Sequence, residues 1–203
     1  MQSKLAITTQ IIRRVPTQRL RRAAQRGITN VQIIIAIGVG LVLLIGALAG
    51  LNYFTKAKVH NEVAAITDLK SNIVNYGAKK GQFTAANTTM AILVGQNFWP
   101  DSAVTPAAAA GGAPTVNNQW GGTIVCAPNA LVNAGDSMLC TYTGVPAKAC
   151  QELGTSLDDA AATVTINAVV TKAQAAQTNS ALVAANCGGA AGDNNTMAVV
   201  FAK

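Results

Sequence analysis

The sequence predicts an α+β protein in which a long N-terminal α-helix, apolar in its first half, packs on a small head with an antiparallel β-sheet. Three observations predict it. No charged residue lies between Gly27 and Lys56. Apolar residues then continue at helical spacing from Val59 to Tyr76, and short strand-like runs separated by turn-forming residues follow. Such a helix needs a nonpolar surround for its first half and a sheet for its second half.

The first 27 residues are predicted to form a basic leader. They hold seven cations and no acid, which accounts for the whole formal charge of +7, and the eight later cations balance all eight acids. We expect these cations to keep the N-terminus on the cytoplasmic side of a membrane, as the positive-inside rule predicts. The positive charge therefore does not indicate a direct nucleic-acid site, and the bulk of the chain is expected outside the cytoplasm.

The apolar run from Ile33 to Leu51 has 19 residues. A helix needs roughly 20 to cross a bilayer, whereas a secretory signal has an apolar region of about 7–15. We therefore predict a membrane helix, residues 28–52, that is kept in the product, with its processing signal before the run. One alternative is a secreted soluble domain cut after Ala49, because Ala47-Leu48-Ala49 has the small-x-small form of a signal peptidase site. An uncleaved single-span protein is another.

The second half of the helix, residues 53–80, is predicted to be amphipathic. Six apolar residues recur at spacings of three and four: Val59, Val63, Ile66, Leu69, Ile73 and Tyr76. The helix is expected to run from about Thr29 to Tyr76 and to end at Gly77, since glycine often follows the last helical residue.

Residues 81–203 are predicted to form the globular α+β head. A short helix is expected at 88–94, capped by Thr88 or Asn87, followed by an Ala/Gly/Pro-rich loop from Pro100 to Pro114. A second helix is expected from Pro146 to Leu157, because proline suits a first helical turn. Strands are expected at 122–127, 137–143, 163–170 and 196–202.

The four cysteines all lie in the part predicted to be exported: Cys126, Cys140, Cys150 and Cys187. An even count in an oxidising compartment predicts two disulfides, for which three pairings exist. A bridge from Cys126 to Cys140 across one hairpin is the simplest choice, and it leaves Cys150 to pair with Cys187. A metal site is the rival, but no C-x-x-C pair occurs and the single His60 is far away in sequence.

No residue pattern indicates catalysis, a cofactor or a metal. His60 is expected to face solvent or another subunit, and Asp158-Asp159 to end a helix or begin a turn. Ser and Thr residues have no base that the sequence can assign to them. Trp120 is expected to anchor the core or the edge of the head. The sequence therefore predicts no enzyme activity.

At the N-terminus the chain resembles a type IV prepilin. Arg26-Gly27, followed by Ile28 and the apolar run, is similar to the site of prepilin peptidase. The long leader, the residue other than Phe at position 28, the Asn118-Gln119-Trp120-Gly121-Gly122 run and the Cys150 to Cys187 span resemble the type IVb subclass, including the major pilins of conjugative thin pili.

The resemblance implies a structural subunit with no cofactor. Prepilin peptidase would cut between Gly27 and Ile28, and Ile28 would be N-methylated. The subunit would be held in the inner membrane and then assembled with copies of itself, by an inner-membrane platform and an assembly ATPase, into an extracellular pilus that also contains minor pilins. Such a filament would serve conjugative DNA transfer or cell adhesion.

One position departs from the family pattern. The fifth residue after the cut is usually Glu, and here it is Gln32. In pilins that carboxylate is thought to pair with the N-terminal amine of the neighbouring subunit, whereas Gln32 can accept a hydrogen bond from the amine but cannot neutralise it. The main subunit is favoured because the head is of ordinary size, with a minor pilin or a type II secretion pseudopilin as alternatives.

Overall fold

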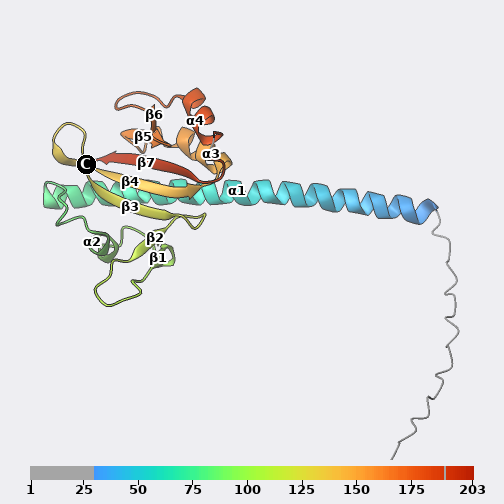
Figure 1. Cartoon of the computed structure of the whole chain (residues 1–203), viewed down its shortest axis with the longest axis horizontal. Coiled ribbons are helices and arrows are strands. Elements are labelled where there is room, and N and C mark those ends of the chain that lie inside the picture. The colour runs from blue at the N-terminus through green and yellow to red at the C-terminus, as the bar shows by residue number, and fades with distance from the viewer. Residues whose placement is uncertain (1–29, 190) are drawn as a thin grey trace, which may run out of the picture. The chain divides into compact units, whose positions relative to one another are not determined.

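The computed structural model describes residues 30–189 and 191–203, and it describes no side chains at 30–36, 38, 42 and 44–52. The chain divides into two units, Met1–Ile45 and Gly46–Lys203. The second unit contains the head and the helical residues that pack on it (Figure 1).

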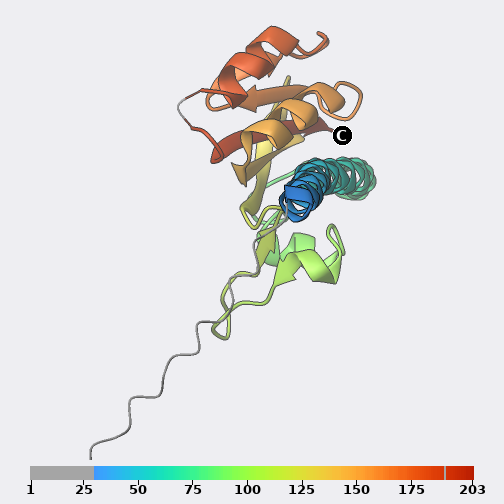
Figure 2. The same ribbon diagram turned by 90° about the vertical axis from the view of Figure 1, so that its right-hand side faces the viewer.

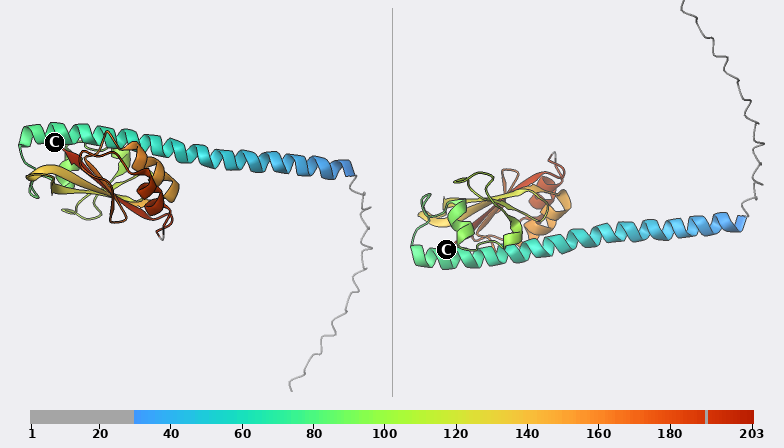
Figure 3. Two further views of the ribbon diagram at one scale, coloured as in Figure 1. Left: turned by 90° about the horizontal axis from the view of Figure 1, so that it is seen from above. Right: turned by 90° about the horizontal axis from the view of Figure 1, so that it is seen from below.

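Helix α1, Asn30–Lys80, buries the predicted apolar stripe against the head. Val59, Ile66, Leu69, Ile73 and Tyr76 are buried, and Val63 is half-buried. Figure 3 shows this part of α1 alongside the head from two opposite sides. The period of the apolar residues thus predicted which face of the helix meets the sheet.

The predicted end of this helix at Gly77 was wrong. The helix continues to Lys80, and the residue that leaves it is Gly81, whose φ of 79° lies in the left-handed region. Gly77 has a packing role instead. A Cβ there would lie 2.9 Å from Cζ of Phe83 and 2.9 Å from Cβ of Lys203.

The described head contains one antiparallel sheet in the order β1-β2-β3-β4-β7-β5-β6. Strands β3, β4 and β7 match predicted strands. The strand predicted at 163–170 is instead a hairpin of β5 and β6, because the chain turns at Asn167 and Ala168, both with positive φ. β1 and β2 lie where a loop and connecting region were expected. The strands are β1 Val104–Thr105, β2 Thr115–Asn117, β3 Thr123–Ala130, β4 Ala134–Val145, β5 Thr163–Ile166, β6 Val169–Lys172 and β7 Asn195–Ala202.

One face of the sheet forms the core. The register aligns alternate buried residues of β3, β4, β7 and β5, and these join the buried residues of α1 in a single cluster. Figure 2 looks nearly along α1 and shows the sheet beside it. The other face includes Val125, which is 54% exposed, so the sheet has one dry face and one wetter face.

Three shorter helices complete the head. Helix α2, Met90–Gly95, is capped by Thr89, so the predicted start at Thr88 with a Thr88 or Asn87 cap was wrong. Helix α3, Ala147–Ser156, lies within the expected range, but Pro146 is its N-cap rather than a residue of its first turn. Helix α4, Ser180–Cys187, was not predicted, and a 3-10 turn at Asp101–Ala103 lies within the expected loop.

Candidate functional site

The residues predicted to carry processing lie outside the described ones. Gly27 and Ile28 precede them, and the backbone of Gln32 belongs to α1 while its side chain is not described. Within the described residues, no helix is long and apolar enough to cross a membrane. Cleavage, methylation and the membrane stage therefore stay predictions.

Helix α1 exposes large apolar side chains. In the first unit Ile37, Val39 and Leu43 are each more than half exposed. In the second unit Tyr53 and Phe54 are 73% and 67% exposed, and their ring centroids lie 6.4 Å apart in an edge-to-face arrangement. Exposed apolar residues that gather in this way typically mark a surface that binds another protein or a membrane.

The Asn118-Gln119-Trp120-Gly121-Gly122 run forms a tight loop between β2 and β3. Oδ1 of Asn118 accepts hydrogen bonds from the backbone N–H groups of Trp120 and Gly122, both at 3.0 Å, and its Nδ2 donates to the carbonyl oxygen of Thr143 at 2.7 Å. Gly121 has a φ of 83°, which favours glycine. Trp120 is half-buried against the core, as expected.

Glu62 of α1 lies under this loop. Its side chain is 2% exposed, and Oε2 accepts a hydrogen bond from the backbone N–H of Gln119 at 3.0 Å. Burial raises the pKa of this carboxyl, and the Gln119 hydrogen bond opposes that rise. Burial, together with the negative charge of Glu62, also raises the pKa of the Tyr142 hydroxyl.

Two adjoining cavities lie at this site, and Glu62 lines the first of them. The first, which we call the Glu62 cavity, has a volume of about 320 Å³ and is lined by Glu62, Trp99 and Tyr142 among others. The second, which we call the outer groove, has a volume of about 730 Å³ and is lined in part by Asp68 and Asp101. They share Ala65, Trp99, Pro100 and Gln119.

A disulfide joins Cys126 of β3 to Cys140 of β4, which face each other in the sheet with Cα atoms 4.1 Å apart. Asp136 holds the turn between these strands. Its carboxylate accepts hydrogen bonds from the backbone N–H groups of Leu131, Val132 and Asn133, at 2.7–2.8 Å. These hydrogen bonds hold the pKa of Asp136 well below its ordinary value.

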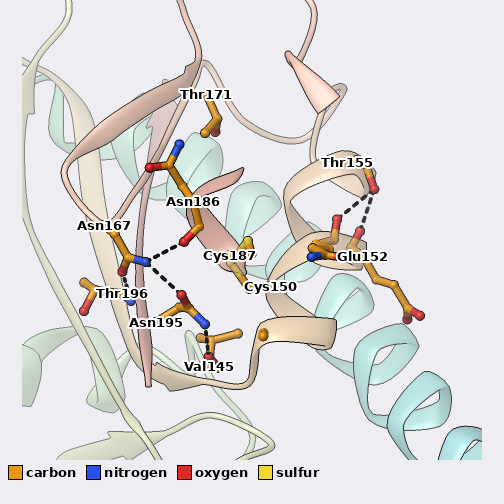
Figure 4. Close-up of a disulfide and its surroundings, with 12 residues drawn as sticks. Val145, Cys150, Glu152, Thr155, Asn167, Thr171, Asn186, Cys187, Asn195 and Thr196 are labelled. Carbon is orange, nitrogen blue, oxygen red and sulfur yellow. Dashed lines mark hydrogen bonds between the residues drawn. A yellow bond between two sulfur atoms is a disulfide. The ribbon is translucent and has the colours of Figure 1, made fainter. Parts of the chain in front are cut away.

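A second disulfide joins Cys150 of α3 to Cys187 of α4. Beside it, Nδ2 of Asn167 donates to the carbonyl oxygen of Asn186 at 2.9 Å and to Oδ1 of Asn195 at 2.8 Å (Figure 4). The turn between β5 and β6 is thereby held to the start of β7 and to α4. The disulfide and these amides fasten the last third of the chain together.

Asp158 has a structural role, as its predicted place at a helix end suggests. Its Oδ1 accepts hydrogen bonds from the hydroxyl and the backbone N–H of Thr178, which lower the pKa of the carboxyl. Neighbouring Asp159 offers its carbonyl oxygen to the Lys70 ammonium of α1 at 2.6 Å.

The described residues contain no group of three or more His, Cys, Asp or Glu that could hold a metal ion. His60 is exposed on α1, and all four cysteines are in disulfides. The exposed apolar side chains of α1 suit the described residues to association. The arrangement combines a helix with exposed apolar side chains, a doubly cross-linked head and an acidic cavity beside the helix.

Sequence reasoning missed Glu62, Gln119 and Tyr142 as one site. Glu62 was not predicted to be buried. Its spacing held the signal, because it lies three residues after Val59 and four before Ile66, both on the buried stripe. The partners from the loop and from β4 come from distant sequence positions, which no local pattern reveals.

Comparison with known proteins identifies the family to which this architecture belongs. A family model described as PilS N terminal matches residues 56–202. The type IVb pilin from Salmonella typhi has a TM-score of 0.56 at 21% identity, with 71% of this chain and 99% of that chain covered. TcpA, a type IV pilin from Vibrio cholerae El Tor biotype, has a TM-score of 0.53 at 14% identity, with 72% and 99% covered. No curated protein sequence matches the chain.

Proposed function

The chain belongs to the PilS N-terminal family and has the type IVb pilin fold, so it is a structural subunit and not an enzyme, and from this premise we propose how it is used. We propose that residues 28–52 hold the subunit in the inner membrane until it is assembled into a helical surface filament. The observation that carries the proposal is the family match over residues 56–202 directly behind the uncharged apolar run.

The same helix would serve both states. A helix that is apolar all round is stable in lipid, and after extraction it can pack against copies of itself. A head-to-tail contact repeated by a rotation that does not close gives an open filament rather than a ring. The exposed Tyr53 and Phe54, just past the apolar run, would extend this contact toward the head.

Processing and assembly follow from the same proposal. Prepilin peptidase would cut after Gly27 and Ile28 would be methylated, and an inner-membrane platform with its ATPase would then add subunits. The test is intact-mass and N-terminal peptide mass spectrometry of filaments sheared from cells that contain their own prepilin peptidase. A chain that begins at Ile28 with one added methyl group is expected. A chain that begins at Gly50 would overturn the proposal and establish a secreted domain.

Gln32 favours a second candidate, a minor pilin, because it cannot neutralise the amine of a neighbouring subunit. The amount of this chain in the sheared fraction distinguishes the two. A major subunit dominates that fraction by mass, whereas a minor pilin is present in trace amounts.

For the filament's role we propose conjugation or adhesion. Deleting the gene for this chain is expected to lower mating frequency in liquid culture if the filament transfers DNA. It is expected to lower cell attachment, with mating unchanged, if the filament is an adhesin.

A further inference from the structure

Glu62 is a buried acid whose hydrogen-bonding capacity exceeds what its surroundings use. A carboxylate has about four acceptor sites, and the hydrogen bond that the structure gives Glu62 comes from the Gln119 N–H. An ionised carboxylate buried without a cation is unfavourable. The Glu62 cavity leaves room beside it for a further donor.

Shaping the loop does not by itself account for this acid. Asn118 already holds residues 118–122 through its hydrogen bonds to Trp120, Gly122 and Thr143. The Gln119 N–H could be satisfied by a neutral amide or by water as well as by a carboxylate. The loop therefore does not need the negative charge of Glu62.

The surroundings of the cavity suit a cation. Glu62, Asp68 and Asp101 line the cavity and the adjoining outer groove, and no Lys, Arg or His is among the described residues that line either. Trp99 and Tyr142 also line the Glu62 cavity, and aromatic side chains can attract ammonium groups. Three of the eight acids of the chain thus line a region that no described cation lines.

The matching cation lies on the same helix. Between residue 28 and Glu62 the only Lys residues are Lys56 and Lys58, and this stretch has no acid. Lys56 is exposed and precedes Glu62 by six residues and Ala65 by nine, which places it about 120° and 180° around the helix from them. Lys58, four residues before Glu62, lies within about 40° of Glu62. Lys56 therefore faces away from the cavity of its own chain.

We propose that in the filament Lys56 of one subunit places its ammonium group in the Glu62 cavity of a second copy of the chain. This inference rests on the proposed filament function. Because the donor and the cavity lie on opposite faces of α1, the contact is head-to-tail and repeats without closing. If the α1 helices of the two subunits run parallel, the donor subunit is shifted along α1 by the length of six to nine residues. At a rise of 1.5 Å per residue, this shift is about 9–14 Å.

The test is zero-length carbodiimide cross-linking of sheared filaments, which joins a lysine amine to a carboxylate only where the two are in contact. Linked peptides are then mapped by mass spectrometry. We expect Lys56–Glu62 links and covalent dimers and higher multimers in filaments, and no such links in full-length subunits dispersed in detergent micelles. Lys56→Gln should remove the multimers, and the matched variant Lys58→Gln should retain them.

The outcomes separate this inference from the proposed function. Absence of the chain from any sheared filament would overturn the filament function, and this inference with it. Filaments that contain the chain but yield no Lys56–Glu62 link would overturn the inference alone. A link from Lys56 only to Asp68 or Asp101, or a link to Glu62 from another lysine, would also overturn it. Because the wild-type map decides, a variant that fails to assemble does not affect the test.

Discussion

At the scale of the residue, some positions determine the shape of the head, whereas others are not needed for that shape. Gly122 belongs to the first kind, since the loop passes so close to β4 that no Cβ fits there. Glu62 belongs to the second kind, because the loop keeps its shape through Asn118. Each role predicts a different response to substitution.

Replacing Gly122 by Ala should cost about 3 kcal/mol or more of unfolding free energy. Its Cβ would lie 1.8 Å from the carbonyl oxygen of Thr143, so β4 or the loop has to move. The matched control is Gly121→Ala. There φ is 83° but no atom lies within 4 Å, so the cost should be only about 1 kcal/mol. Urea unfolding of the full chain in detergent measures both, and equal costs would contradict the steric argument.

Replacing Glu62 by Gln should make the dispersed subunit less sensitive to pH. The folded pKa of Glu62 is raised, so the folded state binds its proton more tightly than the unfolded state. The stability from this group is therefore full below the ordinary carboxyl value near 4.3 and is lost as pH rises through the folded pKa. Gln keeps the acceptor for Gln119 without the charge.

Melting curves at pH 5 and pH 8 measure this effect. Wild type should lose more of its melting temperature than Glu62→Gln over that interval. Asp136 and Asp158 do not obscure the comparison, because their lowered pKa values place their contribution below the ordinary carboxyl range. An equal loss of melting temperature in both proteins would show that ionisation of Glu62 in the folded state does not lower stability.

At the scale of the element, periodic patterns predicted more than local signals did. The apolar stripe of α1 was predictable because its period of 3.6 extends over several turns. The end of α1 was not, because Gly77 and Gly81 are both glycines near that end and only tertiary packing distinguishes them. The β5–β6 turn at Asn167-Ala168 was missed because Ala does not ordinarily indicate a residue with positive φ.

The candidate site was predictable in pieces. The resemblance to type IVb pilins marked the Asn118–Gly122 run, and residue type marked the four cysteines. It did not place Glu62 beneath that loop, since this requires knowing which strand lies over which turn of α1. Helix α4 was missed because its eight residues include no charge and only two large apolar side chains to show a period.

The two disulfides should differ in their contribution to stability. The Cys150–Cys187 bond spans 37 residues and the Cys126–Cys140 bond spans 14. In the chain-entropy model, the longer loop is worth about 4 kcal/mol and the shorter about 3. Paired Cys→Ser variants of each bond, compared by urea unfolding, should show the larger loss for Cys150–Cys187. A larger loss for Cys126–Cys140 would contradict this order.

At the scale of the whole molecule, the subunit combines a cross-linked head that packs on the second half of α1 with exposed apolar side chains earlier on the same helix. The head buries one contiguous core and two disulfides. Tyr53 and Phe54 stay exposed although they lie only a few residues before Val59, which is buried. One part of α1 therefore packs in the fold, and an earlier part of the same helix is left exposed for association.

Replacing Tyr53 and Phe54 together by Ser should abolish filaments while leaving the fold intact. Because both rings are mostly exposed, the unfolding free energy should change by no more than about 0.5 kcal/mol. The yield of the sheared fraction, normalised to total subunit, measures assembly. Val132→Ser is the matched control, since Val132 is 76% exposed on the β3–β4 turn of the head. Normal filament yield from the Tyr53 and Phe54 variant would contradict an assembly role for this helix surface.

The position of β7 has a consequence for the order of events in time. Strand β7, the last of the described strands in chain order, lies between β4 and β5 in the sheet. A chain synthesised from its N-terminus therefore carries two separate strand groups, β1–β4 and β5–β6, each with an unpaired edge, until β7 has been made. At that stage β3 and β4, which carry Cys126 and Cys140, can already pair. Strands β5 and β6 are not yet joined to them. Completion of the sheet is thus a late event, and a chain cut short before β7 cannot join its two groups of strands.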